Sequence, residues 1–280
     1  MIVETADPRG LSETNPTERP DDASEGPGYR ARMKARHGVL DEVFDATYLA
    51  FYEEMLGPER TATDCDRILT LLDAPAGARL LDLCCGHGRH AMELASRGRR
   101  VVGVDRSFSY LRRAMAEGTS CARFLLSDVT ALPIVEEVAD GAYCWFTSIG
   151  YGEAESDRRM LGEAWRVLRP GARLVVETRN WGTIEPGSTV TIDTPRGRIT
   201  DRVSLDETRR RIVMQRRYEP IDDAPRDVSF SLRLYTAKQF VGMLEEAGFR
   251  DVVALGEEDR PFRDGDRRIA FVGRRPGGDR

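Results

Sequence analysis

The sequence predicts an α/β fold built on a doubly wound parallel sheet, with a smaller antiparallel sheet inserted late in the chain. Short apolar strands alternate with helical segments between residues 79 and 177, which is the pattern of parallel βαβ units. Between residues 187 and 235 the periodicity changes to every second residue, which indicates antiparallel strands. A helix and two more strands follow.

Two glycines mark the first βαβ unit. An apolar strand at 79–83 enters a turn that contains Gly86 and Gly88, a helix follows at 89–97, and the next strand ends at Asp105. Glycines allow a backbone to approach a ligand closely, and a helix N-terminus offers free N–H groups. An acid at the end of the second strand can accept hydrogen bonds from ribose hydroxyls. The unit therefore predicts binding of an adenosine-containing small molecule.

The remaining elements follow from apolar periodicity and from turn residues. Ser107 is expected to cap its helix, and Gly248 to end the last one. Three or four antiparallel strands are expected in the insert. Helices are expected at 30–73 (broken at 57–58 and resuming at 63), 107–118, 155–168 and 236–247, and strands at 100–104, 122–126, 139–146, 173–177, 249–255 and 268–274.

These elements predict six parts along the chain. Residues 1–28 are rich in Pro, Glu, Asp, Thr and Ser, so we expect a disordered tail. The other parts are a helical lid at 29–76, a nucleotide-binding core at 77–182, an antiparallel insert that roofs the substrate at 183–235, the completion of the core sheet at 236–275 and a tail at 276–280.

Composition favours a cytoplasmic protein that binds neither membrane nor nucleic acid. The chain has 280 residues, 42 basic against 47 acidic, and no signal-peptide pattern. Short basic pairs such as Arg216–Arg217 are expected on a solvated surface. Five cysteines without a CxxC pair predict reduced, buried thiols. Three histidines are too few for a multi-histidine metal site, so no metal site is predicted.

Residues 86–91 also fit the GxGxxA fingerprint of dinucleotide-binding proteins. Asp82 argues against NAD, because its carboxylate would repel a pyrophosphate but attract a sulfonium or ammonium group. Asp128 follows the third strand, where a polar acceptor can meet an adenine amino group. The chain also lacks a second mononucleotide-binding half. An NAD(P)-dependent oxidoreductase therefore remains the weaker alternative.

The motifs together resemble the class I S-adenosyl-L-methionine (SAM)-dependent methyltransferases, in particular those that act on small molecules. The resemblance covers about residues 40–275 and implies a Rossmann-like seven-stranded sheet whose last strand is antiparallel. One departure is His90, at the position expected for the family's third glycine, and another is His87. The segments that carry the resemblance are 81–88, 101–105, 127–133, 146–151 and 166–171.

The resemblance implies SAM as the cofactor and assigns residues to it. Asp82 would face the charged methionyl end, Gly86 and Gly88 would allow backbone approach, Asp105 would hold the ribose and Asp128 the adenine. Further cofactor-binding residues implied are Cys85, Arg106, Val129 and Trp145.

The acceptor is expected over the ends of the fourth and fifth strands. Arg179 could bind a substrate carboxylate through two hydrogen bonds. His37 is the histidine outside the glycine segment and could serve as a base carried by the lid. Candidate catalytic residues are His37, Tyr151 and Arg179; candidate substrate-binding residues are Tyr48, Tyr52, Ser148, Trp181, Arg233 and Tyr235, with Asn180 beside them.

The predicted function is methyl transfer from SAM to a small-molecule acceptor with an N or O nucleophile. Methyl transfer from a sulfonium is an in-line displacement, in which the protein mainly supplies proximity and alignment. One alternative is a SAM-binding enzyme of the same fold with non-methylating chemistry such as cyclisation. Another is a non-catalytic SAM-binding protein. The insert could also form a homodimer contact.

Overall fold

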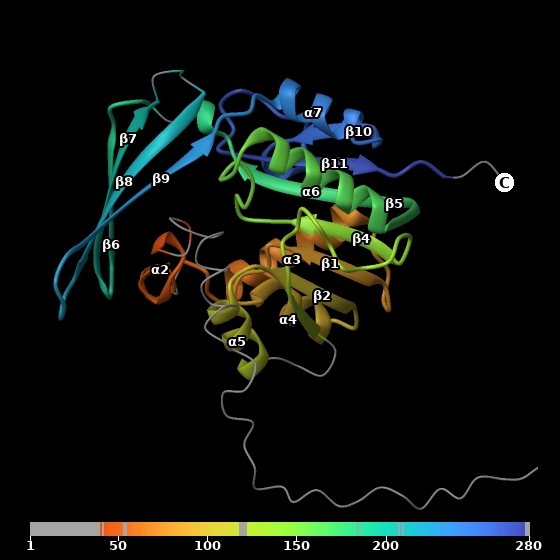
Figure 1. The fold of residues 1–280 in the computed structure, drawn as a ribbon, viewed down its shortest axis with the longest axis horizontal. Helices are drawn as coiled ribbons and strands as arrows, with labels where there is room; N and C mark the ends of the chain where they lie inside the picture. Colours follow the sequence, from red (N-terminus) through yellow and green to blue (C-terminus); the bar gives the residue numbers. More distant parts are fainter. Residues whose placement is uncertain are drawn as a thin grey trace, which may run out of the picture. The chain divides into compact units, whose positions relative to one another are not determined.

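A seven-stranded sheet carries the fold (Figure 1). The computed structural model describes residues 40, 42–52, 55–117, 122–183, 185–206, 208 and 210–277, which belong to one compact unit, Val39–Arg280. Strand β11 runs antiparallel to both neighbours, and β1 to β5 are parallel, as expected. The strand order is β10 (Arg250–Leu255), β11 (Arg268–Arg274), β5 (Leu168–Arg179), β4 (Ala139–Cys144), β1 (Arg79–Leu83), β2 (Arg100–Asp105) and β3 (Ala122–Leu126).

Helices cover both faces of this sheet. On one face, α3 (Pro58–Leu72) and α4 (Arg89–Ser96) bury Ile68 and Leu94 against Leu80 of β1, and α5 (Phe108–Glu117) packs beside them. On the other face, α6 (Ala154–Val167) and α7 (Ala237–Glu246) pack over Leu81. Neighbouring residues of β1 therefore face opposite layers, because side chains alternate along a strand.

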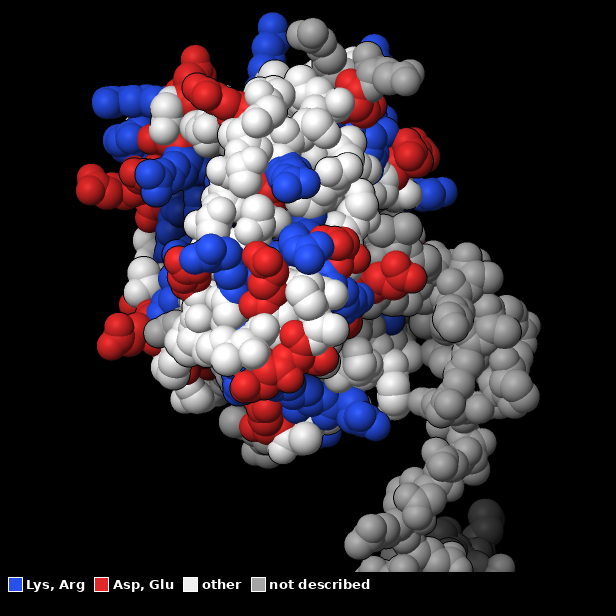
Figure 2. Space-filling view, turned by 90° about the vertical axis from the view of Figure 1, so that its left-hand side faces the viewer, with Lys and Arg blue, Asp and Glu red and all other residues white. Residues whose placement is uncertain are grey.

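The insert forms a separate four-stranded antiparallel sheet with its strands in chain order: β6 (Thr189–Thr194), β7 (Gly197–Leu205), β8 (Arg211–Pro220) and β9 (Arg226–Arg233). Helix α2 (Ala46–Tyr52) packs against its buried face, so Phe51 joins Ile212 and Leu232 in one core (Figure 1). Acidic and basic side chains are intermixed on the side of the molecule that Figure 2 shows.

Three boundaries differ from the expected ones. Helix α3 begins at Pro58, because proline fits the first helical position, where its missing N–H is not needed. Strand β5 begins directly after α6 and includes Gly171, with φ 85°. Strand β4 ends early because Phe146 and Thr147 adopt φ values of 65° and 60°, outside the β region.

Candidate functional site

The turn after β1 has left-handed backbone at three positions. Cys84, Gly86 and Gly88 have φ values of 60°, 57° and 78°. The expectation that His90 replaces a turn glycine was wrong, because His90 is buried in the first turn of α4. Among the three left-handed positions of the turn, the non-glycine residue is Cys84, which lies before the start of the GxGxxA pattern at Gly86.

The two turn glycines have different surroundings. A Cβ on Gly88 would lie 2.6 Å from Phe124, so close packing between α4 and β3 requires glycine there. Among the described residues, a Cβ on Gly86 would meet Tyr110 alone within 4 Å, at the ordinary contact distance of 3.7 Å. The backbone at Gly86 is therefore open to a ligand, which is what close approach to a nucleoside needs.

Asp105 ties the end of β2 to this turn. Its Oδ2 accepts the backbone N–H of Gly86 at 2.8 Å, and its Oδ1 accepts that of Ser107 at 2.8 Å. Burial raises the pKa of Asp105 above its usual value, although these hydrogen bonds oppose the shift. A carboxylate offers about four lone-pair sites, so each oxygen can also accept a ribose hydroxyl.

Asp82 is buried in β1, opposite Tyr143 of β4. Its Oδ2 has no hydrogen-bond partner among the described residues. Burial raises the pKa of Asp82 to about 8. A buried polar atom without a partner is costly, so this carboxyl group suits a ligand that brings a positive charge or a donor.

A buried cluster joins α3 to the first turn of α4. Arg89 donates to Asp64 at 2.8 Å and to Thr61 at 3.0 Å. His90 Nε2 lies 3.3 Å from Asp64, and burial lowers the pKa of His90 to about 4. At neutral pH the ring is therefore uncharged and holds the helix in place.

The other residues assigned to the cofactor flank the same strand ends, and their roles stay predictions. Asp128 follows β3, is exposed, and its Oδ1 accepts both the N–H and the hydroxyl of Thr130 at 2.8 Å. Cys85 and Trp145 are buried, with 7% and 4% exposure, and Val129 packs against the core. Arg106 follows Asp105 directly.

Aromatic side chains from three parts of the chain meet between α2 and the insert. The aromatic cluster consists of Phe44, Tyr48, Tyr52, Tyr151 and Phe230. Tyr48 and Tyr52 stack with ring centroids 4.4 Å apart, and the Tyr151 ring lies 5.1 Å from that of Phe44. Burial raises the pKa of Tyr52 to about 12 and raises those of Tyr48 and Tyr151 as well. These phenols therefore stay protonated at neutral pH.

A buried ion pair between Arg216 and Asp201 lies against this cluster, and the sequence did not predict it. Arg216 donates two hydrogen bonds of 2.7 Å to Asp201, and its guanidinium lies 5.3 Å from the Tyr52 ring. The assignment of Arg216 to the solvated surface was wrong: it is 7% exposed, whereas Arg217 is exposed. The signal was available, because Arg216 lies between the apolar neighbours Met214 and Tyr218, two residues away on either side.

The remaining candidates lie around the segment after β4. The Ser148 hydroxyl donates to the Trp145 carbonyl, and the Arg179 N–H donates to Thr147 Oγ1. The Asn180 amide donates to the carbonyls of Asp264 and Asp266, so it holds a loop rather than a ligand.

Arg233 and Tyr235 reach the start of α6. Arg233 pairs with Glu153 at 2.7 Å, and the Tyr235 hydroxyl donates to Asp157 at 2.6 Å. His37 and the Trp181 side chain lie outside the described residues. The substrate and catalytic roles of these residues stay predictions.

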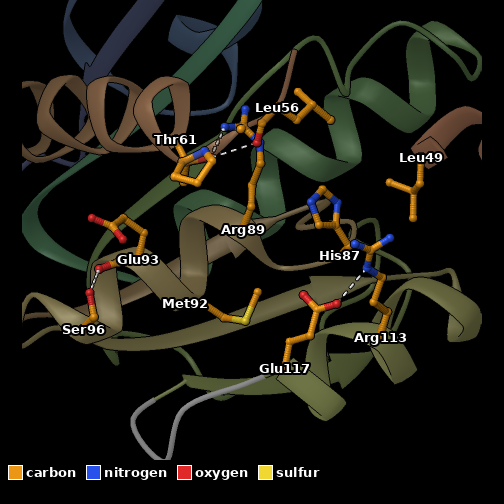
Figure 3. Close-up of a pocket in the computed structure, with 12 residues that line it drawn as sticks. Leu49, Leu56, Thr61, His87, Arg89, Met92, Glu93, Ser96, Arg113 and Glu117 are labelled. Carbon is orange, nitrogen blue, oxygen red and sulfur yellow. Dashed lines mark hydrogen bonds and ion pairs between the residues drawn. The ribbon is translucent and has the colours of Figure 1, made fainter. Parts of the chain in front are cut away.

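A cavity of about 480 Å³ lies beside the glycine turn, on the outer side of α4 (Figure 3). Its lining includes His87 and Arg89 of the turn and the start of α4, but neither Asp105 nor Asp128. The other lining residues are Leu49, Leu56, Gly57, Pro58, Thr61, Met92, Glu93, Ser96, Arg113 and Glu117.

No described helix is long and apolar enough to cross a membrane. In the same part of the chain, no group of three or more His, Cys, Asp or Glu side chains lies close enough together to hold a metal ion.

Comparison with known proteins shows similarity to a methyltransferase-domain family and to SAM-dependent enzymes. Residues 80–171 match a family model described as a methyltransferase domain. The malonyl-[acyl-carrier protein] O-methyltransferase of Pectobacterium atrosepticum is 30% identical over 126 residues, which are 45% of this chain and 48% of that protein. The S-adenosyl-L-methionine-dependent Diels-Alderase iccD of Talaromyces variabilis is 26% identical over 196 residues, 67% of this chain and 58% of that protein. The chain thus spans about half the length of such relatives.

A solved structure extends the likeness to most of the chain. CalS10, a SAM-bound amino pentose methyltransferase from Micromonospora echinaspora, superposes with a TM-score of 0.61. The match covers 91% of this chain and 99% of CalS10 at 21% identity, so it shows the fold. The chain therefore shares the fold of CalS10, and the segment that matches the methyltransferase-domain model, residues 80–171, contains the glycine turn, Asp105 and Asp128.

Proposed function

We propose that the protein transfers a methyl group from SAM to a small-molecule acceptor. The observation that carries the proposal is the geometry of Asp105, which closes the glycine turn through Gly86 and keeps lone pairs for a ribose. It lies within the segment that matches a methyltransferase domain. A nucleoside on this carboxylate would lie against the open backbone of Gly86.

The unpaired carboxyl oxygen of Asp82 supports the same cofactor. When bound, SAM supplies a methyl group on a positively charged sulfonium, which needs no further activation. Its methionyl end also carries an ammonium group, and a positive charge near Asp82 would lower the raised pKa of that carboxyl group. Asp82 would then be ionised and would orient the donor.

The aromatic cluster favours an amine as the acceptor. Its phenols stay protonated, so they can orient an acceptor but cannot take a proton from an alcohol. A neutral amine needs no base before it attacks: the N–C bond forms as the C–S bond breaks, its electron pair stays on sulfur, and the extra proton on nitrogen leaves to solvent. CalS10, which has the same fold, is an amino pentose methyltransferase.

A second candidate is SAM-dependent catalysis without methyl transfer. The relative iccD is named a Diels-Alderase, and this chain covers 58% of it. A cofactor held by Asp105 could assist a cyclisation through its positive charge alone. The two candidates share the cofactor site and differ in whether S-adenosylhomocysteine is formed.

Calorimetric titration with S-adenosylhomocysteine tests the cofactor site. Asp105→Ala removes the ribose acceptor, and hydrogen bonds to a charged group contribute about 1.5–3 kcal/mol, so we expect Kd to rise by roughly tenfold or more. Asp193→Ala, at an exposed residue of β6, is the control and should bind like the wild type. Binding of NAD in place of the nucleoside, or equal binding by the Asp105 variant, would contradict the proposal.

Product analysis then separates the two candidates. The protein is incubated with SAM and a panel of primary amines, secondary amines and phenols, and both S-adenosylhomocysteine and methylated product are quantified. Methyl transfer predicts equal amounts of the two, with amines preferred over phenols. An acceptor that is converted while SAM stays intact would support the non-methylating candidate instead.

A further inference from the structure

The segment that follows β4 carries Ser148 and Tyr151, and the insert holds most of it in place. Its first part is fixed by the core, because Glu177 of β5 accepts the N–H of Phe146 at 2.9 Å. From Gly150 onward the contacts change. The N–H of Arg233, at the end of β9, donates to the Gly150 carbonyl at 2.7 Å.

Arg211, the first residue of β8, makes the densest set of these contacts. Its guanidinium donates to the carbonyl of Gly152 at 3.0 Å and to that of Tyr151 at 3.0 Å. A longer contact of 3.4 Å reaches the Gly150 carbonyl. The Ser231 hydroxyl accepts from Arg211 Nε at 3.0 Å, which fixes the guanidinium plane. One side chain therefore binds three consecutive carbonyls of the segment.

The opposite side of the segment is fixed through α6. The Gly150 N–H donates to Asp157 Oδ1 at 3.2 Å, and Asp157 Oδ2 accepts the Tyr235 hydroxyl at 2.6 Å. Gly150 has φ 92°, and a Cβ there would lie 3.1 Å from the Arg233 carbonyl. Both polar groups of Gly150 are thus bonded, and the positive φ together with the close carbonyl of β9 favours glycine at this position.

We propose that Arg211 is a positioning residue for the reaction: it fixes the carbonyls of residues 150–152 so that the Tyr151 ring stays in the aromatic cluster. This inference rests on the proposed function, because it assumes that the acceptor binds against that cluster. The hydrogen bonds of the Arg211 side chain to described residues go to residues 150–152 and Ser231 and not to Asp82, Gly86 or Asp105, so its loss should affect the acceptor side alone.

The test compares Arg211→Ala and Arg211→Lys with the wild type. Lysine keeps the charge but cannot bind three carbonyls and Ser231 together, because its ammonium is a point donor and not a planar fork. The matched control is Arg217→Ala, at an exposed residue of the same strand whose partners are Asp227 and Glu219. Hydrogen exchange is followed in peptides that contain the amides of Gly150 and Arg233.

Both Arg211 variants should exchange these amides about tenfold faster, while β1 to β3 exchange at the wild-type rate. The Kd for S-adenosylhomocysteine should stay within about twofold of the wild type. With an acceptor from the amine panel, the acceptor KM should rise or kcat fall while the KM for SAM is kept, and millimolar guanidinium should restore part of the activity of Arg211→Ala.

Unchanged exchange at Gly150 and Arg233 in both variants would overturn the positioning role. A parallel loss of nucleoside affinity would overturn it too, because Arg211 would then act on the whole fold. If Arg211→Ala fails to fold, Tyr235→Phe gives a milder test, since it removes only the hydroxyl that holds Asp157. If the wild type does not bind S-adenosylhomocysteine, the proposed function fails, while the exchange result still decides whether Arg211 holds residues 150–152 in place.

Discussion

Cys84 has a strained backbone conformation that lowers the stability of the protein. Its φ of 60° lies in the left-handed region, where a residue with a Cβ is disfavoured by roughly 1–2 kcal/mol relative to glycine. Cys84→Gly relieves that strain and loses a half-buried thiol, so we expect the free energy of unfolding to rise by about 0.5–1 kcal/mol. Urea unfolding followed by circular dichroism measures the change.

The neighbouring cysteine is the matched control for this substitution. Cys85 has no positive φ and is 7% exposed, so Cys85→Gly should lower the free energy of unfolding by about 1 kcal/mol or more. Equal effects of the two substitutions would show that backbone strain at Cys84 is not what distinguishes them.

For single residues, the sequence predicted those positions that depend on neighbouring residues in the chain. Asp105 follows a strand and a glycine turn, and the structure places it on the Gly86 N–H. Arg216 was misplaced because its role depends on Asp201, which lies on the neighbouring strand. The register between β7 and β8 determines this partner, and a cluster of basic residues in the sequence does not reveal that register.

At the scale of elements, the insert sheet combines an apolar face with one buried ion pair. Asp201→Ala would leave the Arg216 guanidinium buried without its partner, which typically costs about 3–5 kcal/mol. The double variant Asp201→Leu with Arg216→Met should recover most of this loss, because apolar residues can replace a buried pair. Denaturant unfolding of the single and double variants measures the coupling.

An exposed ion pair in the same sheet provides the comparison. Asp193 pairs with Arg198 at the surface, so Asp193→Ala should leave the unfolding midpoint close to that of the wild type. If the double variant Asp201→Leu with Arg216→Met were as unstable as Asp201→Ala, the loss of stability would come from packing and not from the unpaired charge of Arg216.

Element types were more predictable than element ends. The periodicities located the strands and helices of the central sheet, and Ser107 caps α5 through the Tyr110 N–H as expected. The end of β4 could not be read from sequence, because Phe146 and Thr147 leave the β region although both favour strands. Glu177, which accepts the Phe146 N–H, is distant in sequence, and it fixes that conformation from the next strand.

At the scale of the whole molecule, Asp82 links folding to pH. Its pKa is about 8 in the folded protein against about 3.9 in an unfolded chain, so the folded state holds a proton that the unfolded state releases between these values. The free energy of unfolding should therefore fall as pH rises, by up to about 1.4 kcal/mol per pH unit between roughly pH 5 and 7.

Asp82→Asn removes this proton and keeps the shape of the side chain, so its stability should depend less on pH. Urea unfolding at a series of pH values measures both slopes. The exposed variant Asp193→Asn is the control and should keep the wild-type slope. A slope in Asp82→Asn equal to that of the wild type would show that other groups, such as Asp105 and Asp157, account for the pH dependence.

The number of strands in the central sheet and the antiparallel direction of the last one came from a resemblance, whereas the second sheet came from periodicity alone. Neither source predicted that α2 would pack on the insert while α3 packs on the central sheet. Apolar residues in a helix indicate that it is buried, but they do not show which sheet it packs on. The six expected parts of the chain stay a prediction.

The Arg211 contacts have a consequence for recombining this protein with its relatives. The four-stranded sheet leaves the core after β5 and returns before α7, so it looks like a module that could be exchanged to alter acceptor choice. However, Arg211, the first residue of β8, donates hydrogen bonds to the carbonyls of residues 150–152, which lie outside this module in the sequence. A chimaera with a relative should therefore take residues 148–153 and residues 184–235 from the same parent protein.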